Sequence, residues 1–317
     1  MRMPDSPPRG LADLGQACRN ARVAVTGGAG FIGRRLVGRL VEMAAKVTVV
    51  DRVEPGAAAL TADAEHITAD LRQAGAARRA LSGADIVFHL AGNSDAVRSM
   101  ARPLLDFEAN ALGTLNVARA AVAVGVRRVV YLSTALVYGQ QRQFPLGEKL
   151  LPAPTFPYAA SKLAGESIFE GFRHSYELES VCGRAFVVYG AAGVNKRVEV
   201  HHYLDRISRG HMIHSLGDPD RKTRDFIHVD DVVNALLFLA EVPAEARLVN
   251  IGTGVETSLR QLAGLVAEAL GRPVPGWRVV PSPQDEFRQV ADTAKLRRLG
   301  FTPAVSLREG IALLTHR

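Results

Sequence analysis

The sequence has 317 residues, of which 47% are hydrophobic and 22% are charged, a composition typical of a globular protein and unlike a disordered or collagen-like chain. Its 39 Lys and Arg outnumber its 32 Asp and Glu, which gives a formal net charge of +7 at pH 7. This mild excess suits nucleic acid, a membrane surface or a small anionic ligand, so the distribution of the charges has to decide among them. The two cysteines, Cys18 and Cys182, lie far apart and indicate neither a disulfide framework nor a zinc ribbon.

The N-terminal segment predicts a peripheral tail over residues 1–20. It contains Pro4, Pro7 and Pro8 and lacks the apolar stretch of a secretory signal. No apolar run in the chain approaches the roughly 18 residues that a membrane span needs. We therefore expect a cytoplasmic protein that does not associate with a membrane.

From residue 22 onward, short apolar runs alternate with longer amphipathic stretches. The predicted strands of the first half cover residues 22–26, 46–51, 85–90, 128–133 and 180–188. The predicted helices of the same half cover residues 31–43, 104–124 and 158–176. Strands joined by helical crossovers, and apolar along their whole length, predict a parallel sheet with helices on both faces, an α/β fold.

The rhythm changes after Gly190 and predicts a second unit. Further helices are expected over residues 197–210, 231–241, 259–270 and 306–314, with strands over residues 225–229 and 247–251. We therefore expect a first domain over residues 21–190 and a smaller C-terminal α/β lobe over residues 191–317, partly interleaved with the first.

A glycine-rich segment, TGGAGFIG, connects the first strand to the first helix at residues 26–33. Gly27, Gly30 and Gly33 suit a tight turn, a backbone that approaches a pyrophosphate closely, and close helix–strand packing. The free N–H groups and positive dipole end of the helix then face the phosphates. The pattern predicts a dinucleotide site on a doubly wound sheet of the Rossmann type.

An acidic residue, Asp51, ends the second strand 18 residues after Gly33. A carboxylate there accepts hydrogen bonds from the ribose hydroxyls of adenosine and repels a 2′-phosphate, so NAD is favoured over NADP. Arg52 weakens this preference, because an arginine at this place could stack on adenine or pair with a phosphate.

A tyrosine and a lysine, Tyr158 and Lys162, begin the helix after Pro157 at a spacing that places both on one face. A free tyrosine has a pKa near 10, too high for a base at neutral pH. A nearby ammonium and a cationic nicotinamide would lower that pKa. The strand before this helix ends in Ser133 and Thr134, and the Thr134 hydroxyl could exchange a proton with Tyr158 or polarise a substrate oxygen. For Ser133 a structural role is the stronger interpretation.

Together these motifs resemble the extended short-chain dehydrogenase/reductase superfamily and, within it, the NAD-dependent nucleotide-sugar epimerase/dehydratase family. The resemblance extends from about residue 21 to residue 315. It includes the segments His89–Gly92, Ser133–Gly139, Gly183–Gly190, Thr223–Asp231 and Asn250–Gly254, in the family's order.

The resemblance implies a role for each matching residue. The first domain would bind NAD through Gly27, Gly30, Phe31, Ile32, Gly33, Asp51, Arg52, Asp70, Leu71, Leu90, Ala91, Gly92, Asn110, Tyr158 and Lys162. The smaller lobe would help bind a nucleotide-diphosphate sugar, whose contacts would be Asn93, Ser94, Thr134, Arg224 and Arg288. Tyr158, Lys162 and Thr134 would be the catalytic set, with no metal. The family usually forms homodimers through the helices matching residues 104–124 and 158–176.

The residues after Thr134 bear on the reaction that the family resemblance implies. Family dehydratases have Asp-Glu there, decarboxylases tend to have Glu at the second position, and 3,5-epimerases have Cys, whereas this chain has Ala135 and Leu136. Oxidation and re-reduction at C4 remain, so we expect a 4-epimerase similar to UDP-glucose/galactose 4-epimerases. The alternatives are a 4,6-dehydratase, a 4-ketoreductase, a hydroxysteroid-type dehydrogenase and a non-catalytic NAD-binding regulator.

Two departures from the family pattern concern the substrate site. Val187 replaces an Asn that usually touches substrate, and Arg288 stands at a different offset from the family's second phosphate-binding Arg. The histidines His201, His202, His211 and His214 lack supporting carboxylates at a convincing metal-binding spacing. No basic face with interleaved aromatic residues is visible, so we expect no nucleic-acid partner.

Overall fold

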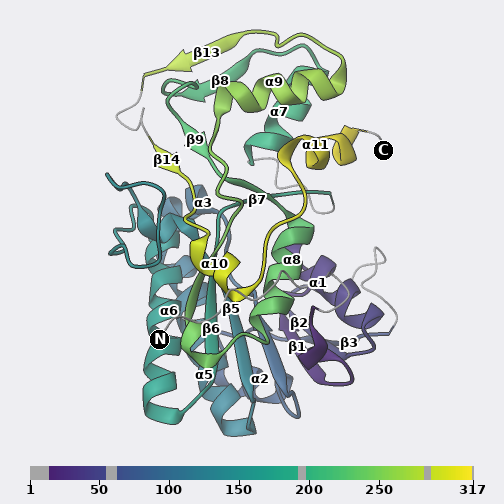
Figure 1. Cartoon of the computed structure of the whole chain (residues 1–317). Coiled ribbons are helices and arrows are strands. Elements are labelled where there is room, and N and C mark those ends of the chain that lie inside the picture. The colour runs from purple at the N-terminus through teal and green to yellow at the C-terminus, as the bar shows by residue number, and fades with distance from the viewer. Residues whose placement is uncertain (1–13, 55–62, 192–197, 282–286, 316–317) are drawn as a thin grey trace.

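The computed structural model describes residues 14–54, 63–191, 198–281 and 287–315; residues 1–13 of the predicted tail lie outside it. Its centre is a seven-stranded sheet in the order β11-β6-β5-β4-β1-β2-β3, in which every neighbouring pair is parallel (Figure 1). The strands are β1 (Arg22–Thr26), β2 (Lys46–Asp51), β3 (Glu65–Thr68), β4 (Ile86–His89), β5 (Arg128–Thr134), β6 (Ser180–Ala185) and β11 (Leu248–Ile251).

Helices cover both faces of this sheet. The α1 helix (Phe31–Glu42) packs with α8 (Val229–Leu239) on one face, and α5 (Gly113–Val124) lies between α2 (Ala74–Ala80) and α6 (Pro157–Tyr176) on the other. Side chains alternate between the two apolar cores, because successive strand residues point to opposite faces. Along β1, Val23 and Val25 join the α1 side, whereas Ala24 joins the α5 side. The predicted doubly wound α/β fold is confirmed.

The predicted helix over residues 104–124 is interrupted. It consists of α4 (Pro103–Phe107), a π-helical turn (Glu108–Leu112) and α5, and the short α3 (Ala96–Ala101) precedes it. A π turn adds one residue to a helical turn and is frequent at functional sites. Here it contains Asn110, which is fully buried.

The predicted strand over residues 180–188 breaks after β6. The Phe186 amide donates to Ile251 O at 3.0 Å, whereas the Val187 amide donates to Asp225 O at 3.0 Å. The chain thus leaves the large sheet, and β7 (Val187–Tyr189) pairs with β10 (Phe226–His228) instead. This step leads the backbone from the large sheet toward the smaller lobe.

The smaller lobe, at the top of Figure 1, has its own apolar core. Three helices surround this core: α7 (Glu199–Ser208), α9 (Leu259–Leu270) and α11 (Leu307–Thr315). Its strands are β8 (Ile213–Leu216) with β13 (Trp277–Val280), and β9 (Thr223–Arg224) between β12 (Thr257–Ser258) and β14 (Arg288–Gln289). The remaining helix, α10 (Ala294–Leu299), contacts β11 below the lobe.

The two halves of the chain interleave extensively. Helix α8 and strand β11 come from the second half, yet they complete the large sheet and its helical cover. The described end of the predicted tail is also part of this core, because Leu14 and Cys18 are 3% and 0% exposed. The Ala17 amide donates to Glu241 Oε1 at 3.0 Å. Residues 14–20 are therefore packed structure rather than a peripheral tail, since apolar side chains there fill a gap beside α8.

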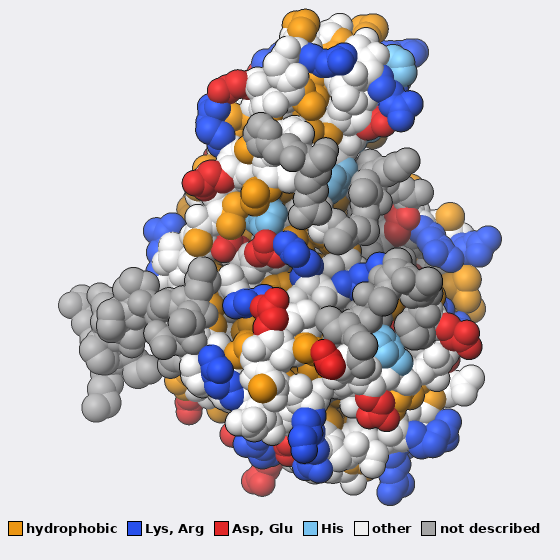
Figure 2. All heavy atoms as spheres, turned by 90° about the vertical axis from the view of Figure 1, so that its right-hand side faces the viewer, with side chains coloured by type: hydrophobic (Ala, Val, Ile, Leu, Met, Phe, Trp, Pro, Cys, Tyr) orange, Lys and Arg blue, Asp and Glu red, His pale blue; other side chains and the backbone are white. Residues whose placement is uncertain are grey.

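The surface shows no segregation of charge on the face in Figure 2, where basic and acidic side chains are intermixed. In the part of the chain that the structure describes, no helix is both long enough and apolar enough to cross a membrane.

Candidate active site

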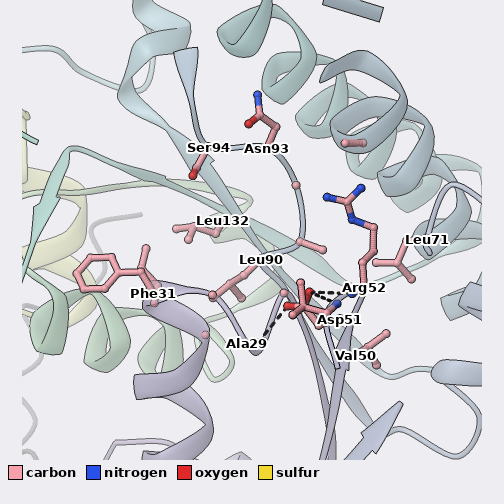
Figure 3. Close-up of a pocket in the computed structure, with 18 of the residues that line it drawn as sticks. Ala29, Phe31, Val50, Asp51, Arg52, Leu71, Leu90, Asn93, Ser94 and Leu132 are labelled. Carbon is pink, nitrogen blue, oxygen red and sulfur yellow. Dashed lines mark hydrogen bonds between the residues drawn. The ribbon is translucent and has the colours of Figure 1, made fainter. Parts of the chain in front are cut away.

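A cleft of about 730 Å³ lies along the carboxyl ends of the central strands, the edge at which open parallel sheets bind ligands. Most of the predicted site residues line it: Gly27, Gly30, Phe31, Ile32, Gly33, Asp51, Arg52, Asp70, Leu71, Leu90, Ala91, Gly92, Asn93, Ser94, Thr134, Tyr158 and Lys162. Asn110, Arg224 and Arg288 are not part of the lining. Figure 3 shows Asp51 and Arg52 near one end of the cleft and Asn93 and Ser94 on a separate loop.

The glycine loop brings the backbone of β1 and α1 against neighbouring chain. A Cβ atom on Gly33 would lie 2.2 Å from Gly27 O, and one on Gly27, whose φ is +70°, would lie 2.7 Å from Ala91 N. Helix α1 begins at Phe31, and its N-cap residue Gly30 provides no side-chain cap. Its first N–H groups therefore face the cleft without a competing side chain, which fits a pyrophosphate group.

The Asp51 carboxylate is tied to the glycine loop (Figure 3). Oδ2 accepts from the Ala29 amide at 3.1 Å, and Oδ1 accepts from the Arg52 and Val53 amides at 2.7 and 3.3 Å. Oδ1 thus has two donors and Oδ2 has one, so Oδ2 keeps acceptor capacity for a further donor. Asp51 thus places a fixed negative group in the cleft lining, and its contact with the ribose of NAD stays a prediction.

Asp70 is paired within the protein by an arginine that the sequence analysis missed. Arg72 Nη2 lies 2.6 Å from Asp70 Oδ2, and Arg72 Nη1 lies 3.2 Å from Glu108 Oε2. The hydrogen bond from the Arg72 side chain lowers the pKa of Asp70. Both Asp70 and Arg72 line the cleft, so the adenosine end has a fixed ion pair rather than a free carboxylate.

Asn110 supports the cleft wall from behind. Its Oδ1 accepts from the Asn93 amide at 2.7 Å, and its Nδ2 donates to Ser161 Oγ at 2.9 Å. A Cβ atom on Gly92 would lie 2.3 Å from Asn110 Oδ1. The buried amide therefore joins the loop after β4 to helix α6. Asn110 is fully buried outside the cleft lining, and its predicted cofactor contact stays a prediction.

A buried acid, Asp106, is a second residue that the sequence analysis missed. The Asn93 Nδ2 and Ser161 Oγ atoms each donate to its carboxylate at 2.5 Å. Its side chain joins Asn93, in the cleft wall, to the helix that carries Tyr158. No local motif marks this acid, because its partners come from distant parts of the chain.

Tyr158 and Thr134 meet at one end of the cleft. Thr134 ends β5, and Tyr158 lies in the first turn of α6 after Pro157. Burial raises the pKa of Tyr158 to about 12, although a hydrogen bond with the Thr134 side chain acts in the opposite direction. The cost of burying a phenolate therefore dominates the pKa of Tyr158, rather than the expected lowering by the Lys162 ammonium.

Lys162 is buried one turn after Tyr158. Its Nζ lies 4.3 Å from the centre of the Tyr131 ring, and the side chain is 5% exposed. Burial lowers the pKa of Lys162 to about 8, and the charge of Glu166 opposes this. The Lys162 side chain thus lies in the cleft lining together with Tyr158.

The two predicted phosphate-binding arginines lie on paired strands, outside the cleft lining. Arg224 is opposite Gln289 and Arg288 is opposite Thr223, so the two arginine side chains leave opposite faces of this small sheet. Arg224 Nε lies 3.3 Å from Glu199 Oε1. Arg288 makes two hydrogen bonds of 2.8 Å to Glu256 and stacks on the Phe144 ring at 4.3 Å. Both guanidinium groups are therefore engaged by carboxylates.

Non-polar residues surround the catalytic end of the cleft. Ala185 and Phe186, at the break after β6, line it together with Leu132, Val188 and Val198. The acids of the lining are Asp51, Glu54 and Asp70, which follow strands at the adenosine end. Within the described ranges no group of three His, Cys, Asp or Glu side chains is arranged to hold a metal ion.

The glycine loop, the acid after β2 and the Thr–Tyr–Lys set define a dinucleotide-dependent enzyme of the α/β class. A sequence model of the NAD dependent epimerase/dehydratase family matches residues 23–252, and this chain belongs to that family. The predicted family and its dependence on NAD are thereby confirmed.

Several relatives are similar over almost the full length. The UDP-glucose 4-epimerase of Mycolicibacterium smegmatis is 35% identical over 92% of this chain and 96% of its own. The structure of the Thermotoga maritima UDP-glucose 4-epimerase with UDP-glucose has a TM-score of 0.86 and 32% identity, and covers 93% of this chain and 97% of that one. The dTDP-glucose 4,6-dehydratase of Streptomyces venezuelae, solved with NAD, has a TM-score of 0.84 and 29% identity, with coverages of 93% and 96%.

Proposed function

We propose that this protein is an NAD-dependent nucleotide-sugar 4-epimerase that acts on a UDP-glucose/UDP-galactose type of substrate. The observation that carries the proposal is the composition of the catalytic end of the cleft. Thr134, Tyr158 and Lys162 line it, while Ala135 and Leu136 replace the acid–base pair that dehydration of the sugar would require. The relatives named above support the same reaction.

The catalytic residues divide the chemistry at C4 of the sugar. Tyr158 takes the proton of the C4 hydroxyl and later returns it, while Thr134 hydrogen-bonds the same oxygen. Lys162 holds the ribose and supplies positive charge that favours the phenolate. Bound NAD would supply the acceptor, and then the donor, of the hydride at C4. Reversal of the configuration requires the 4-keto sugar to present its other face before the hydride returns.

The non-polar walls of the cleft are compatible with rotation of the 4-keto sugar between its two faces. Leu132, Phe186 and Val188 offer no hydrogen bonds from their side chains. A non-polar wall does not fix one face of the sugar, whereas fixed polar partners would bind a single orientation. The diphosphate anchors the other end of the substrate, so the sugar can rotate without leaving the site.

We assign the anchoring to the smaller lobe. Residues 21–190 would hold NAD and residues 191–317 the sugar nucleotide, with Asn93 and Ser94 near the sugar and Arg224 and Arg288 at the diphosphate. The two arginines lie on neighbouring strands, one step apart in the register, and their present partners Glu199 and Glu256 would be exchanged for phosphate oxygens, which pair strongly with guanidinium groups.

The proposed enzyme is a homodimer in the cytoplasm. Large apolar side chains are exposed on α3, α4 and the π-helical turn, beside α6: Val97, Met100, Leu104, Leu105, Phe107 and Leu112. A group of exposed apolar residues on neighbouring helices is typical of an interface. Fractionation of cells that express the chain tests the location.

The reaction is tested with a panel of UDP-, GDP-, CDP- and dTDP-sugars, with products identified by NMR. We expect the C4 epimer of a UDP-hexose to form until equilibrium without added oxidant or reductant. A 4-keto-6-deoxy product would assign the protein to the dehydratases instead. Turnover only with external NADPH would assign it to the ketoreductases.

A further inference from the structure

One buried ion pair near the catalytic helix has no part in the reaction described so far. Glu166 lies one turn after Lys162 on α6 and is 8% exposed, and its partner Arg184 on β6 is 2% exposed. Arg184 Nε donates to Glu166 Oε1 at 2.9 Å, and Arg184 Nη2 donates to Glu166 Oε2 at 2.7 Å. A buried pair of this kind gains little net stability over non-polar residues, so its presence calls for another role.

The same carboxylate reaches the strand that carries Thr134. Ser133 Oγ donates to Glu166 Oε1 at 2.5 Å, and Ser133 precedes Thr134 at the end of β5. Arg184 in turn stacks on the Tyr138 ring at 4.6 Å, and Tyr138 donates to Asn250 Oδ1 at 2.7 Å. Glu166 is thus held in one orientation by groups from two strands.

Tyr158, Lys162 and Glu166 occupy positions i, i+4 and i+8 of one helix, so they lie on the same face. We propose that Glu166 is a positioning residue for the reaction, a fixed negative charge that holds the Lys162 ammonium in its place between the helix and the sheet. Arg184 and Ser133 orient the Glu166 carboxylate. This inference rests on the proposed function in one respect: it is the proposed function that gives Lys162 a catalytic role.

The surroundings of Lys162 leave few other sources of negative charge. The titratable groups that face it are Tyr158 and Glu166 on α6, Asp106 on α4, Tyr131 on β5, Cys182 on β6 and His89 on β4. Asp106 is the other carboxylate, and it is bound by Asn93, Ser161 and Asn110. The charge of Glu166 is the strongest influence that raises the pKa of Lys162, against the burial that lowers it.

The direction in which the pKa of Lys162 changes when the Glu166 charge is removed can be predicted. Without a nearby anion, the cationic form of Lys162 becomes less stable, so its pKa falls. Two unit charges in a protein interior interact strongly enough, even across several ångströms, to shift a pKa by about one unit, and Arg184 is unchanged in Glu166→Gln. We expect the pKa of Lys162 to fall by about one unit in Glu166→Gln.

The test measures the pKa of Lys162 directly and does not depend on catalytic activity. Lysine is rare in this chain, so selective ¹³Cε labelling of the full-length protein, with Lys162→Met to assign the signal, allows its titration by NMR. The expected result is a pKa about one unit lower in Glu166→Gln and close to the wild-type value in Glu166→Asp, which keeps the charge. Glu170→Gln is the matched control, since Glu170 is one turn further along α6, where it pairs with Arg247 at 3.0 Å near the surface.

Two results would overturn the proposal: a Lys162 pKa in Glu166→Gln equal to that of the wild type, or an equal shift in Glu170→Gln. If Glu166→Gln fails to fold, the double change Glu166→Gln/Arg184→Gln leaves no unpaired buried charge. The comparison is then with Arg184→Gln, which differs from the double variant only in the Glu166 charge, and an equal Lys162 pKa in these two variants would contradict the proposal. If the Lys162 pKa falls in Glu166→Gln as expected but the wild-type protein shows no epimerase turnover, the proposed function is refuted and the role of Glu166 stays intact.

Discussion

The reaction proposed here depends on one buried hydroxyl. Tyr158 lies at the end of the cleft, beside Thr134, where burial raises its pKa to about 12. Positive charge must therefore favour the phenolate during the reaction, and Lys162 is the cation nearest in the helix. The chemistry is concentrated in a few side chains, so single substitutions test it.

Replacement of Tyr158 by Phe removes the proton acceptor while it keeps the ring. We expect kcat to fall by about 10³-fold or more, because a positioned acid–base group contributes on the order of 10² to 10⁴-fold. Binding of NAD, measured by calorimetry, should change by no more than a few-fold. Near-normal turnover in Tyr158→Phe would contradict the proton-transfer role.

Arg224 tests the assignment of the smaller lobe. We expect Arg224→Ala to weaken binding of a UDP-sugar by about 10- to 100-fold, because a charge-assisted hydrogen bond to phosphate contributes roughly 1.5–3 kcal/mol. Binding of NAD should stay unchanged. Arg260→Ala is the control, since Arg260 pairs with Asp220 at 2.7 Å on the surface of the same lobe. Equal losses for both ligands would remove Arg224 from the substrate site.

Among the elements, the turn from β1 into α1 has the strictest spatial requirement. A Cβ atom on Gly33 would collide with Gly27 O at 2.2 Å, whereas one on Gly38, in the same helix, would meet nothing within 4 Å. Gly33→Ala should therefore open the turn, reduce NAD affinity and lower the free energy of unfolding by about 2 kcal/mol or more.

The matched change Gly38→Ala should instead raise the free energy of unfolding by about 0.5–1 kcal/mol, because Ala loses less backbone entropy in a helix. Urea unfolding monitored by circular dichroism measures both variants. Similar behaviour of the two variants would show that the packing of this turn is not what selects glycine.

The elements that the sequence predicted well are those with local signals. Strands β1 and β2 have the predicted limits, because apolar runs bounded by a glycine loop and an acid are local features. The break after β6 was not predicted, since it depends on the carbonyl groups of Ile251 and Asp225. The π-helical turn was missed for the same reason, as Asn110 is held by residues 17 and 51 positions away.

The residues of the candidate site likewise divide into those with a local sequence signal, which were predicted, and those without one. The cleft residues carried by motifs were predicted, from the glycine loop to Tyr158. Asp106, Arg72 and Glu166 were not predicted to belong to the site, because each acts through partners that only the fold brings together. For Glu166 a signal existed in the sequence, an acid four residues after Lys162, although such spacings are common on helices.

At the scale of the whole molecule, the two halves of the chain are folded together. Strand β11 and helix α8 belong to the large sheet and its cover, and β7 with β10 connects the two lobes. The chain therefore crosses the boundary predicted at residue 190 more than once, since segments after it complete the large sheet while the smaller lobe keeps an apolar core of its own.

The exposed apolar residues on α4 and the π-helical turn predict that the protein forms a homodimer through these elements. Leu104 is 71% exposed, and Leu104→Glu should convert a dimer into a monomer, because a carboxylate cannot be buried without a partner. Size-exclusion chromatography with light scattering measures the mass. Leu151→Glu is the control, since Leu151 is 84% exposed and lies outside the helices. A monomeric wild type, or an unchanged dimer in Leu104→Glu, would contradict this interface.

The central claim is that hydrogen leaves C4 of the sugar and returns to it within one closed site. The most direct test is turnover of UDP-galactose by the purified protein in D₂O, followed by NMR. The account predicts conversion to UDP-glucose with no solvent deuterium on any carbon, because the C4 hydrogen returns as hydride and only the hydroxyl proton exchanges. Deuterium at C5, together with loss of the C6 hydroxyl, or the absence of any epimer would contradict it.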